Sequence, residues 1–407
     1  MRRASAAVAV AAALVLVGCA GPSPESVAGG GAGSAPGGTE GGPDPVRTGT
    51  PELAVSEVAG GFANPWDVGV LPDGRVLVTE RDGRLSLLSG ATAGASVTPV
   101  DADFSDLLAE GEGGLLGMVV HPDFAQTRLF TTCQTHVEGG TPTDVRLVTW
   151  ELSADGAAAS RVADPLLGGL PINPSGRHSG CRPTLAADGA LLVGTGDTAR
   201  GAIPQDLSSL GGKVLRVDLA TGGPAEGNPF ADADDPARQL VYTYGHRNVQ
   251  GVAVDADGEV WTAEHGPSTD DEVNLLRPGG NYGWDPSQGG TVGGYDESVP
   301  MTDLDRFPDA VPAAWSSGSP VEALSGAAFL AGGQWGDLDG TLVVGALRGE
   351  KLLFMTPQGA AVVEVAVPEA LDGTYGRLRA VRLAPDGALL VSTSNGSDDR
   401  ILRIDPL

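Results

Sequence analysis

Positive charge is scarce in this sequence of 407 residues. It has 25 Lys and Arg against 52 Asp and Glu, which gives a formal net charge of −27 at pH 7. Proteins that bind nucleic acid or anionic membrane surfaces do so largely through clustered basic residues. The balance of charge therefore argues against both as partners of the folded chain.

The sequence also lacks the signatures of several large enzyme classes. It contains no Gly-x-Ser-x-Gly nucleophile elbow, no phosphate-binding loop and no dinucleotide-binding glycine fingerprint. Only five histidines are present, and His178 has no set of cysteine and histidine neighbours at zinc-ligand spacing. A zinc site is therefore not expected there, and no long helical period is evident.

The apolar run at the N-terminus is short for a bilayer span. Arg2 and Arg3 precede it, it covers residues 4–17, and it closes on "LVGC". A basic start followed by a short apolar run is typical of a secretory signal. The closing motif predicts a lipoprotein signal peptide over residues 1–19, with Cys19 as the lipid-modified N-terminus. An ordinary signal peptide with a chance cysteine is the alternative.

Large apolar residues are nearly absent from residues 20–50, where Gly, Ser, Pro and acidic residues dominate. Such a segment cannot bury enough apolar surface to offset the entropy lost on ordering. It predicts a flexible tether between a membrane and a folded domain over residues 51–407. The protein is thus expected to be exported and held outside the cytoplasm, touching the membrane only through its lipid anchor.

One pattern recurs six times in the folded part: an apolar run, a turn containing Asp or Gly, and a second apolar run. Examples are "LPDGRVLVTE", "AADGALLVGTGD" and "APDGALLVSTSN", and in most units a third run follows. Asp-Gly between β-rich runs is a strong hairpin signal. Six units predict an all-β fold, a six-bladed β-propeller with four-stranded antiparallel blades. A single long β-sandwich is the competing fold, but it would not explain the repetition.

Hairpin geometry predicts that one face of this propeller carries the chemistry. The start of the first strand and the end of the second strand lie at the same end of each hairpin. These ends hold polar and charged residues, whereas the other ends hold mainly the repeated turns. The candidate residues at the chemical face are Glu112, His178, Asp197, Arg247, Asn248, Gly266, Pro267, Arg348, Arg377 and Arg379.

Cys133 and Cys181 are the two cysteines of the folded part. Cys133 ends the second strand of the second unit, and Cys181 lies in the first strand of the third unit. The hairpin geometry places both on the same face of adjacent blades. In an exported protein this arrangement predicts a disulfide, with two free thiols as the alternative.

Three features of the chemical face suggest ligands. Arginine forks bind carboxylates, so the arginines indicate a small polyanion, with salt bridges inside an acidic protein as the alternative. The stretch "AEHGPSTDDEVN" offers backbone carbonyls beside acids, which are calcium-ligand types, although a solvated loop has the same composition. His178 could serve as a general base or be a structural histidine. The arginines are Arg182, Arg247, Arg348, Arg377 and Arg379.

Several of these stretches together resemble one known family. They are "EGGLLGMVVHPDF", "GRHSGCRPTLAADGALLVGTGD", "GGKVLRVD", "GHRNVQGVAVDADGEVWTAEHGP", "DEVNLLRPGGNYGW" and "GRLRAVRLAPDG". The sequence from about Asn64 to Asp405 resembles the soluble glucose and aldose sugar dehydrogenases, six-bladed propellers that use pyrroloquinoline quinone (PQQ). The motifs occur in family order.

The resemblance implies roles for the residues nearest the reaction. His178 matches the catalytic histidine that takes the proton from the sugar C1 hydroxyl, and Asp197 matches an acid that orients it. Arg247 and Asn248 match residues that contact the quinone. Glu112 stands near substrate and cofactor, where close relatives have glutamine.

The resemblance also implies two cofactors, PQQ and Ca2+. Arg377 and Arg379 match arginines that bind the PQQ carboxylates, and Arg348 stands where the family has a basic contact with PQQ. Gly266 and Pro267 match the carbonyl ligands of the calcium ion. The expected activity is oxidation of an aldose at C1 to a lactone, with electrons passed to an unidentified respiratory carrier or a dye.

Two departures from the family bear on the sugar. Arg177 precedes His178 where the glucose enzymes have an acid that helps to bind sugar, and the loop between Gly280 and Ser325 does not closely match their substrate loops. Two other functions are open: a propeller that binds or scaffolds without turnover, and a calcium-dependent lactonase or other hydrolase.

Overall fold

The computed structural model describes residues 52–291 and 294–407. The predicted signal peptide, Cys19 and the predicted tether lie outside the described residues and stay predictions. Within the described residues, six four-stranded antiparallel sheets form the six-bladed β-propeller that the repeats predict. None of the helices in the described segments is long and apolar enough to cross a membrane.

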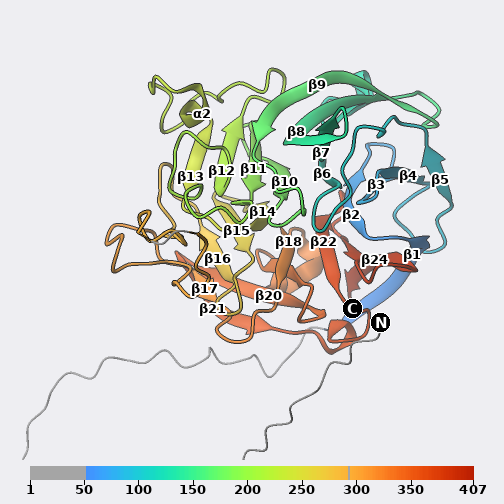
Figure 1. The fold of residues 1–407 in the computed structure, drawn as a ribbon. Helices are drawn as coiled ribbons and strands as arrows, with labels where there is room; N and C mark the ends of the chain where they lie inside the picture. Colours follow the sequence, from blue (N-terminus) through green and yellow to red (C-terminus); the bar gives the residue numbers. More distant parts are fainter. Residues whose placement is uncertain (1–51, 292–293) are drawn as a thin grey trace, which may run out of the picture. The chain divides into compact units, whose positions relative to one another are not determined.

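Each of the first three blades is built from four consecutive strands (Figure 1). Blade 1 consists of β2 (Pro65–Val70), β3 (Val76–Glu80), β4 (Arg84–Leu88) and β5 (Val97–Val100). Blade 2 consists of β6 (Leu115–Val120), β7 (Leu129–Glu138), β8 (Thr141–Leu152) and β9 (Ala159–Leu170). Blade 3 consists of β10 (Gly180–Leu185), β11 (Leu191–Thr195), β12 (Lys213–Val217) and β13 (Val241–Tyr244).

Blades 4 and 5 repeat this pattern, and blade 6 departs from it. Blade 4 consists of β14 (Val249–Val254), β15 (Val260–Glu264), β16 (Glu272–Leu275) and β17 (Trp315–Ser316). Blade 5 consists of β18 (Leu324–Phe329), β19 (Leu342–Ala346), β20 (Lys351–Gln358) and β21 (Ala361–Ala366). Blade 6 consists of β22 (Leu378–Leu383), β23 (Leu389–Thr393), β24 (Asp399–Pro406) and β1 (Leu53–Phe62).

Pairing of the first and last strands closes the ring. β1 runs antiparallel to β24, with Leu53 opposite Pro406 and Phe62 opposite Asp399. The innermost strand of each blade, such as β2, packs against the innermost strand of the next, and β22 packs against β2. The assignment of β1 to blade 6 could not be predicted from the sequence, because β1 lacks the repeated turn.

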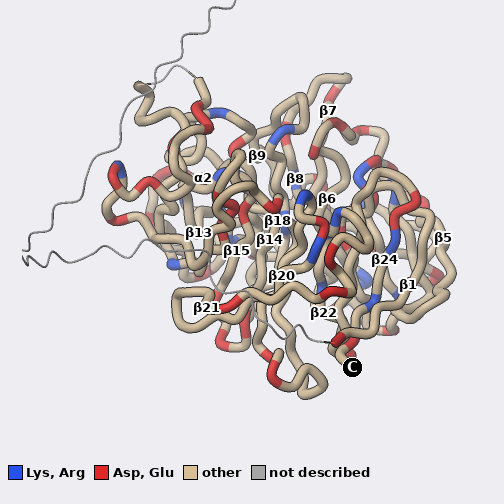
Figure 2. Tube along the Cα trace, turned by 90° about the horizontal axis from the view of Figure 1, so that it is seen from below, with Lys and Arg blue, Asp and Glu red and all other residues tan. Residues whose placement is uncertain are grey.

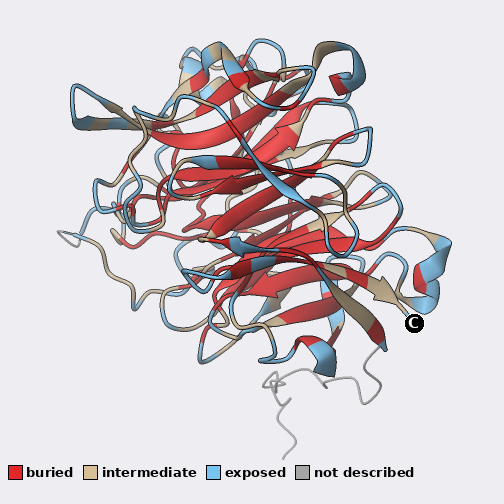
Figure 3. Ribbon diagram, turned by 90° about the vertical axis from the view of Figure 1, so that its right-hand side faces the viewer, coloured by how far each residue is buried: buried red, intermediate tan, exposed pale blue. Residues whose placement is uncertain are grey.

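The short helices lie in the connections between strands. They are α1 (Phe124–Thr127), α2 (Pro236–Gln239) and two 3-10 helices, η1 (Gly333–Leu338) and η2 (Glu369–Leu371). The Asp-Gly turns form as predicted, because Gly74, Gly189, Gly258 and Gly387 all adopt positive φ between 82° and 87°. Burial is concentrated in the strands, whereas the loops are largely exposed (Figure 3).

Apolar side chains fill the space between neighbouring blades. One cluster joins Leu77 of blade 1 to Phe130 and Trp150 of blade 2, and another joins Cys133 of blade 2 to Val193 of blade 3. Burial of this apolar surface is the main favourable contribution to folding. The blades are therefore held at fixed angles, which fixes the residues at the ends of their innermost strands.

The predicted disulfide is confirmed. Cys133 in β7 and Cys181 in β10 are bonded, and both are fully buried. The bond joins blade 2 to blade 3 and closes a loop with a sequence separation of 48 residues. A cross-link over a loop of this length is worth about 4 kcal/mol in the chain-entropy model. It also anchors β10 close to His178, three residues before Cys181.

Candidate active site

His178 and Asp197 come together because β10 and β11 are paired strands. His178 precedes β10, Asp197 follows β11, and Gly180 lies opposite Thr195 in the register. The imidazole Nδ1 lies 2.7 Å from Asp197 Oδ1, and both residues are buried. No described residue forms a hydrogen bond with His178 Nε2. An imidazole that donates from Nδ1 to a carboxylate presents Nε2 as a proton acceptor.

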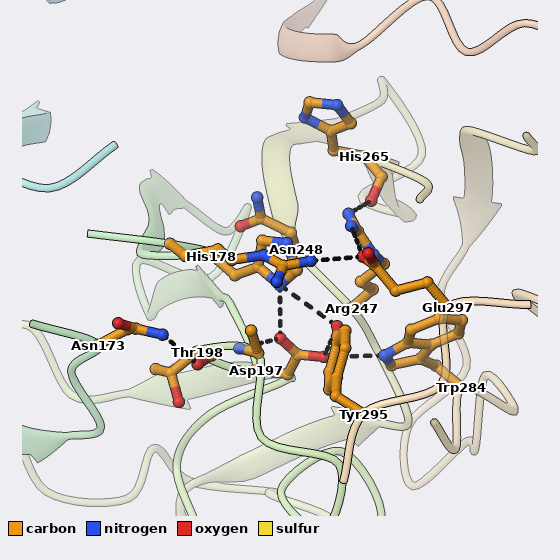
Figure 4. Close-up of polar contacts among 12 residues, drawn as sticks. Asn173, His178, Asp197, Thr198, Arg247, Asn248, His265, Trp284, Tyr295 and Glu297 are labelled. Carbon is orange, nitrogen blue, oxygen red and sulfur yellow. Dashed lines mark hydrogen bonds and ion pairs between the residues drawn. The ribbon is translucent and has the colours of Figure 1, made fainter. Parts of the chain in front are cut away.

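Four donors surround the carboxylate of Asp197 (Figure 4). Oδ1 faces His178 Nδ1 and accepts the Ala199 N–H at 2.8 Å. Oδ2 accepts the Trp284 indole N–H at 2.8 Å and the Tyr295 hydroxyl at 2.6 Å. These four contacts fix the orientation of the carboxylate. Asp197 is thus held in place against His178.

Trp284 and Tyr295 belong to the connection between β16 and β17, residues 276–314. Sequence reasoning did not include them in the site, because this connection has no repeat and Trp284 is 87 residues from Asp197 in sequence. The same connection supplies Glu297, whose Oε1 lies 2.6 Å from an Arg247 Nη and 2.7 Å from an Arg177 Nη. A non-repeating connection therefore forms one side of the site.

Arg247 is fixed from three sides. Its guanidinium donates to the His265 carbonyl oxygen at 2.7 Å and pairs with Glu297. Its backbone N–H donates to Glu264, which also accepts a hydrogen bond from His246 Nδ1. Arg247 Nε is buried and has no hydrogen-bond partner among the described residues. A buried donor of this kind is costly unless a ligand or water satisfies it.

Glu112 links blade 2 to blade 4. Its Oε2 accepts a hydrogen bond from Asn248 Nδ2 at 2.9 Å. It also lies close enough to His265 and Arg379 to affect their protonation. Burial lowers the pKa of His265 to about 4, against the opposite influence of Glu112. The five residues predicted nearest the reaction, Glu112, His178, Asp197, Arg247 and Asn248, are thus brought together.

The five arginines that the sequence groups together separate into two sets. Arg182 is wholly buried, lies 3.0 Å from Asp67 Oδ2 and 4.0 Å from the ring centroid of Trp66, and donates to the Gln250 carbonyl oxygen. Arg247 is paired with Glu297. Salt bridges inside the protein, the alternative role, therefore account for Arg182, whereas Arg247 combines a salt bridge with an unpaired Nε and stays a candidate cofactor contact.

The other three arginines have no acidic partner among the described residues. Arg379 is buried, and its Nε donates to Ser394 Oγ at 3.2 Å. Burial, followed by the nearby Arg182, lowers the pKa of Arg379 to about 9. Arg377 is close enough to contribute to this shift, whereas Arg348 is exposed and no recorded contact joins it to the others.

Acidic segments occur over the whole of the described chain, and basic segments are fewer (Figure 2). This distribution matters because the chain as a whole is strongly acidic. Unpaired arginines inside an acidic protein form a local site for an anion.

The Gly266–Pro267 loop presents two free carbonyl oxygens. Neither accepts a hydrogen bond from a described residue. The loop is held by Asp271, whose Oδ1 accepts the Gly266 N–H at 2.8 Å and whose Oδ2 accepts the Ala323 N–H at 2.7 Å. Burial raises the pKa of Asp271 to about 6. Free carbonyls on a fixed loop suit a hard cation such as Ca2+.

Two buried carboxyl groups lie side by side, and one of them accepts the Arg247 backbone N–H. Glu264 in β15 is directly opposite Glu272 in β16, and both are buried. Glu272 accepts a hydrogen bond from Thr302 Oγ1 at 2.9 Å. Burial, and next the charge of Glu264, raise the pKa of Glu272 to about 8. Glu272 therefore carries a proton at neutral pH, and Glu264 is left to accept hydrogen bonds from Arg247 and His246.

We expect Glu272→Gln to flatten the pH dependence of stability. The unfolded chain releases this proton near pH 4.5 and the folded protein near pH 8, so stability falls as the pH rises between these values. Relative to the parent, the variant should gain about 1 kcal/mol or more between pH 5 and pH 8, measured by urea unfolding. The control is Glu259→Gln, which removes a half-exposed carboxylate paired with Arg277 in the same blade. Equal slopes for Glu272→Gln and the parent would contradict the proton on Glu272.

Comparison with known proteins identifies the family. The model of the glucose/sorbosone dehydrogenase family matches residues 62–403. The chain belongs to this family. The aldose sugar dehydrogenase of Escherichia coli is 30% identical over 348 residues, which are 84% of this chain and 90% of that protein.

Solved structures agree with this assignment. The PQQ-bound aldose sugar dehydrogenase of Streptomyces coelicolor is 31% identical, with a TM-score of 0.68 and coverage of 88% of this chain and 99% of that one. The soluble aldose sugar dehydrogenase of E. coli in its apo form is 27% identical, with a TM-score of 0.74 over 88% of this chain and 100% of that one. These relatives support an oxidoreductase.

Proposed function

We propose that this protein is a PQQ- and calcium-dependent aldose dehydrogenase, which oxidises a sugar at C1 to the lactone. The observation that carries the proposal is the Asp197–His178 pair beside unpaired arginines. His178 offers a free acceptor nitrogen, and Arg379 is a buried cation without an acidic partner.

The positive charges of the residues present match the negative charges of PQQ. PQQ has three carboxylates, and the described arginines without an acidic partner include Arg348, Arg377 and Arg379. Arg247 Nε, which has no partner, and the Asn248 amide, which donates to Glu112, would supply further donors. The free carbonyls of Gly266 and Pro267 would hold Ca2+ without a carboxylate cage, and no group of three or more acidic, histidine or cysteine residues in the described segments is arranged to bind a metal.

When bound, PQQ would supply the hydride acceptor and Ca2+ a Lewis acid for its carbonyl group. The protein's own part is proton transfer and orientation. His178 Nε2 would take the proton of the sugar C1 hydroxyl, and Asp197 would keep the proton on Nδ1 and stabilise the imidazolium that forms. Arg247, held by Glu297 and the His265 carbonyl, would place a fixed positive charge beside the reacting atoms.

Reconstitution tests the activity. Apo-protein loaded with PQQ and Ca2+ should reduce a dye in the presence of at least one member of a panel of aldoses. His178→Ala should bind PQQ as the parent does and lose turnover by about 10²–10⁴-fold, the usual contribution of a general base. His136→Ala, at the partly exposed pair with Asp106, is the matched control and should keep turnover.

Failure to bind PQQ would contradict the proposal. Binding without turnover would favour the scaffold alternative, and hydrolysis of a lactone without PQQ would favour the lactonase.

A second test concerns the anionic part of the site. Arg379→Met should weaken PQQ binding by about 10–100-fold, because a charged hydrogen bond of roughly 1.5–3 kcal/mol is lost. Quenching of tryptophan fluorescence during a PQQ titration measures the affinity. Arg400→Met is the control, because Arg400 pairs with Glu57 on the outer strands. Equal affinities of Arg379→Met and the parent would remove Arg379 from the cofactor site.

We also propose that the chain is an exported lipoprotein anchored through Cys19. The support is the signal-like sequence of residues 1–19 and the Gly- and Pro-rich residues that follow. An anchor of this kind would keep the enzyme near membrane-bound electron carriers. Mass spectrometry of the mature N-terminus checks this, and an unmodified N-terminus beyond Cys19 would contradict it.

A further inference from the structure

Tyr295 reaches the His178–Asp197 pair from a distant part of the sequence. Its hydroxyl lies 2.6 Å from Asp197 Oδ2 and 3.3 Å from His178 Nδ1 (Figure 4). The two partners are 98 and 117 residues away in sequence. Burial, and next the charge of Asp197, raise the pKa of the Tyr295 hydroxyl. The hydroxyl therefore stays protonated and donates to the carboxylate.

The ring of Tyr295 is packed so that this hydroxyl has little freedom. It lies edge-on to Trp284 with ring centroids 6.0 Å apart, and its centroid lies 5.9 Å from that of His178. The guanidinium of Arg177 covers it at 5.4 Å. Trp284 itself donates to the same carboxylate oxygen. Two donors from one connection thus converge on Asp197 Oδ2.

We infer that Tyr295 is a positioning residue that, together with Trp284, limits how strongly Asp197 stabilises the protonated form of His178. The inference rests on the proposed function in so far as His178 is the base. Tyr295 does not itself act on the hydroxyl that reacts, because its oxygen lies at Nδ1, on the side of the imidazole away from Nε2.

The physical reason lies in how the carboxylate shares its charge. Each hydrogen bond that Asp197 accepts disperses negative charge away from His178. With four donors, the carboxylate fixes the imidazole in one orientation while its negative charge is shared among all four. Removing one donor on Oδ2 concentrates charge on the carboxylate. His178 should then take up a proton at higher pH, so less of the base form is present below neutral pH.

Other charged groups face His178 and stay in place when only the tyrosine oxygen is removed. Arg177 and Arg247 both pair with Glu297, and a phenyl ring at position 295 would still lie under Arg177. Besides Asp197 and Tyr295, the charged and titratable groups of the cluster around His178 include Glu112, Arg177, Arg247, His265 and Glu297.

The test is Tyr295→Phe, with Tyr282→Phe as the matched control. Tyr282 is a buried tyrosine of the same connection, but its hydroxyl donates to the Leu275 carbonyl and does not touch Asp197. In apo-protein, the NMR titration midpoint of the His178 imidazole should move to higher pH in Tyr295→Phe, by roughly half a unit to one unit. The control should titrate as the parent does.

In loaded enzyme, the acid limb of the kcat/KM profile should move in the same direction and by a similar amount. Trp284→Phe, which removes the other donor on Oδ2, should produce a shift of the same sign. A titration midpoint in Tyr295→Phe equal to those of the parent and the control would overturn the inference, and so would a shift to lower pH. Because the apo-protein titration needs neither PQQ nor sugar, its outcome is independent of whether the proposed activity is found.

Discussion

The hydrogen bond between Asp197 and His178 is the interaction on which the site depends. It needs the pairing of β10 with β11, because that pairing brings residues 178 and 197 to the same end of one hairpin. It also needs the connection 276–314, which supplies the indole and phenol that hold the carboxylate from the other side. The proposed base, the acid bonded to it and the two donors behind that acid form one continuous network.

The second feature of the site is that some of its arginines have an acidic partner and others have none, although the protein as a whole is acidic. Arg382 and Arg182 share Asp67 near the axis of the propeller, and Arg247 shares Glu297 with Arg177. Arg379 is left buried without a described acid to pair with. Burying an uncompensated charge is expensive, so such a residue is best explained by an anionic ligand that restores the balance. PQQ, with its three carboxylates, is the ligand that we propose for this position.

Much of this could be read from the sequence because the fold is repetitive. The Asp-Gly turns predict the hairpins, and hairpin geometry alone places His178 with Asp197 and Cys133 with Cys181. The same reasoning failed where residues come from outside the repeats. Tyr295 and Glu297 belong to a connection without periodicity, although "NYGW", which contains Trp284, was one of the family-like motifs that could have indicated it. Arg182 was grouped with the ligand arginines because its buried partner, Asp67, lies in another blade.

The reductive half of the reaction offers the most direct test of the central claim, because it does not require the unidentified electron acceptor. Protein loaded with PQQ and Ca2+ is mixed with an aldose in the absence of any external electron acceptor. The amount of lactone formed per loaded chain is then measured. The account predicts one lactone per loaded chain for the parent, and none on the same time scale for His178→Ala loaded to the same extent. Lactone formation at the parental rate by His178→Ala, or none by the loaded parent with any aldose, would contradict it.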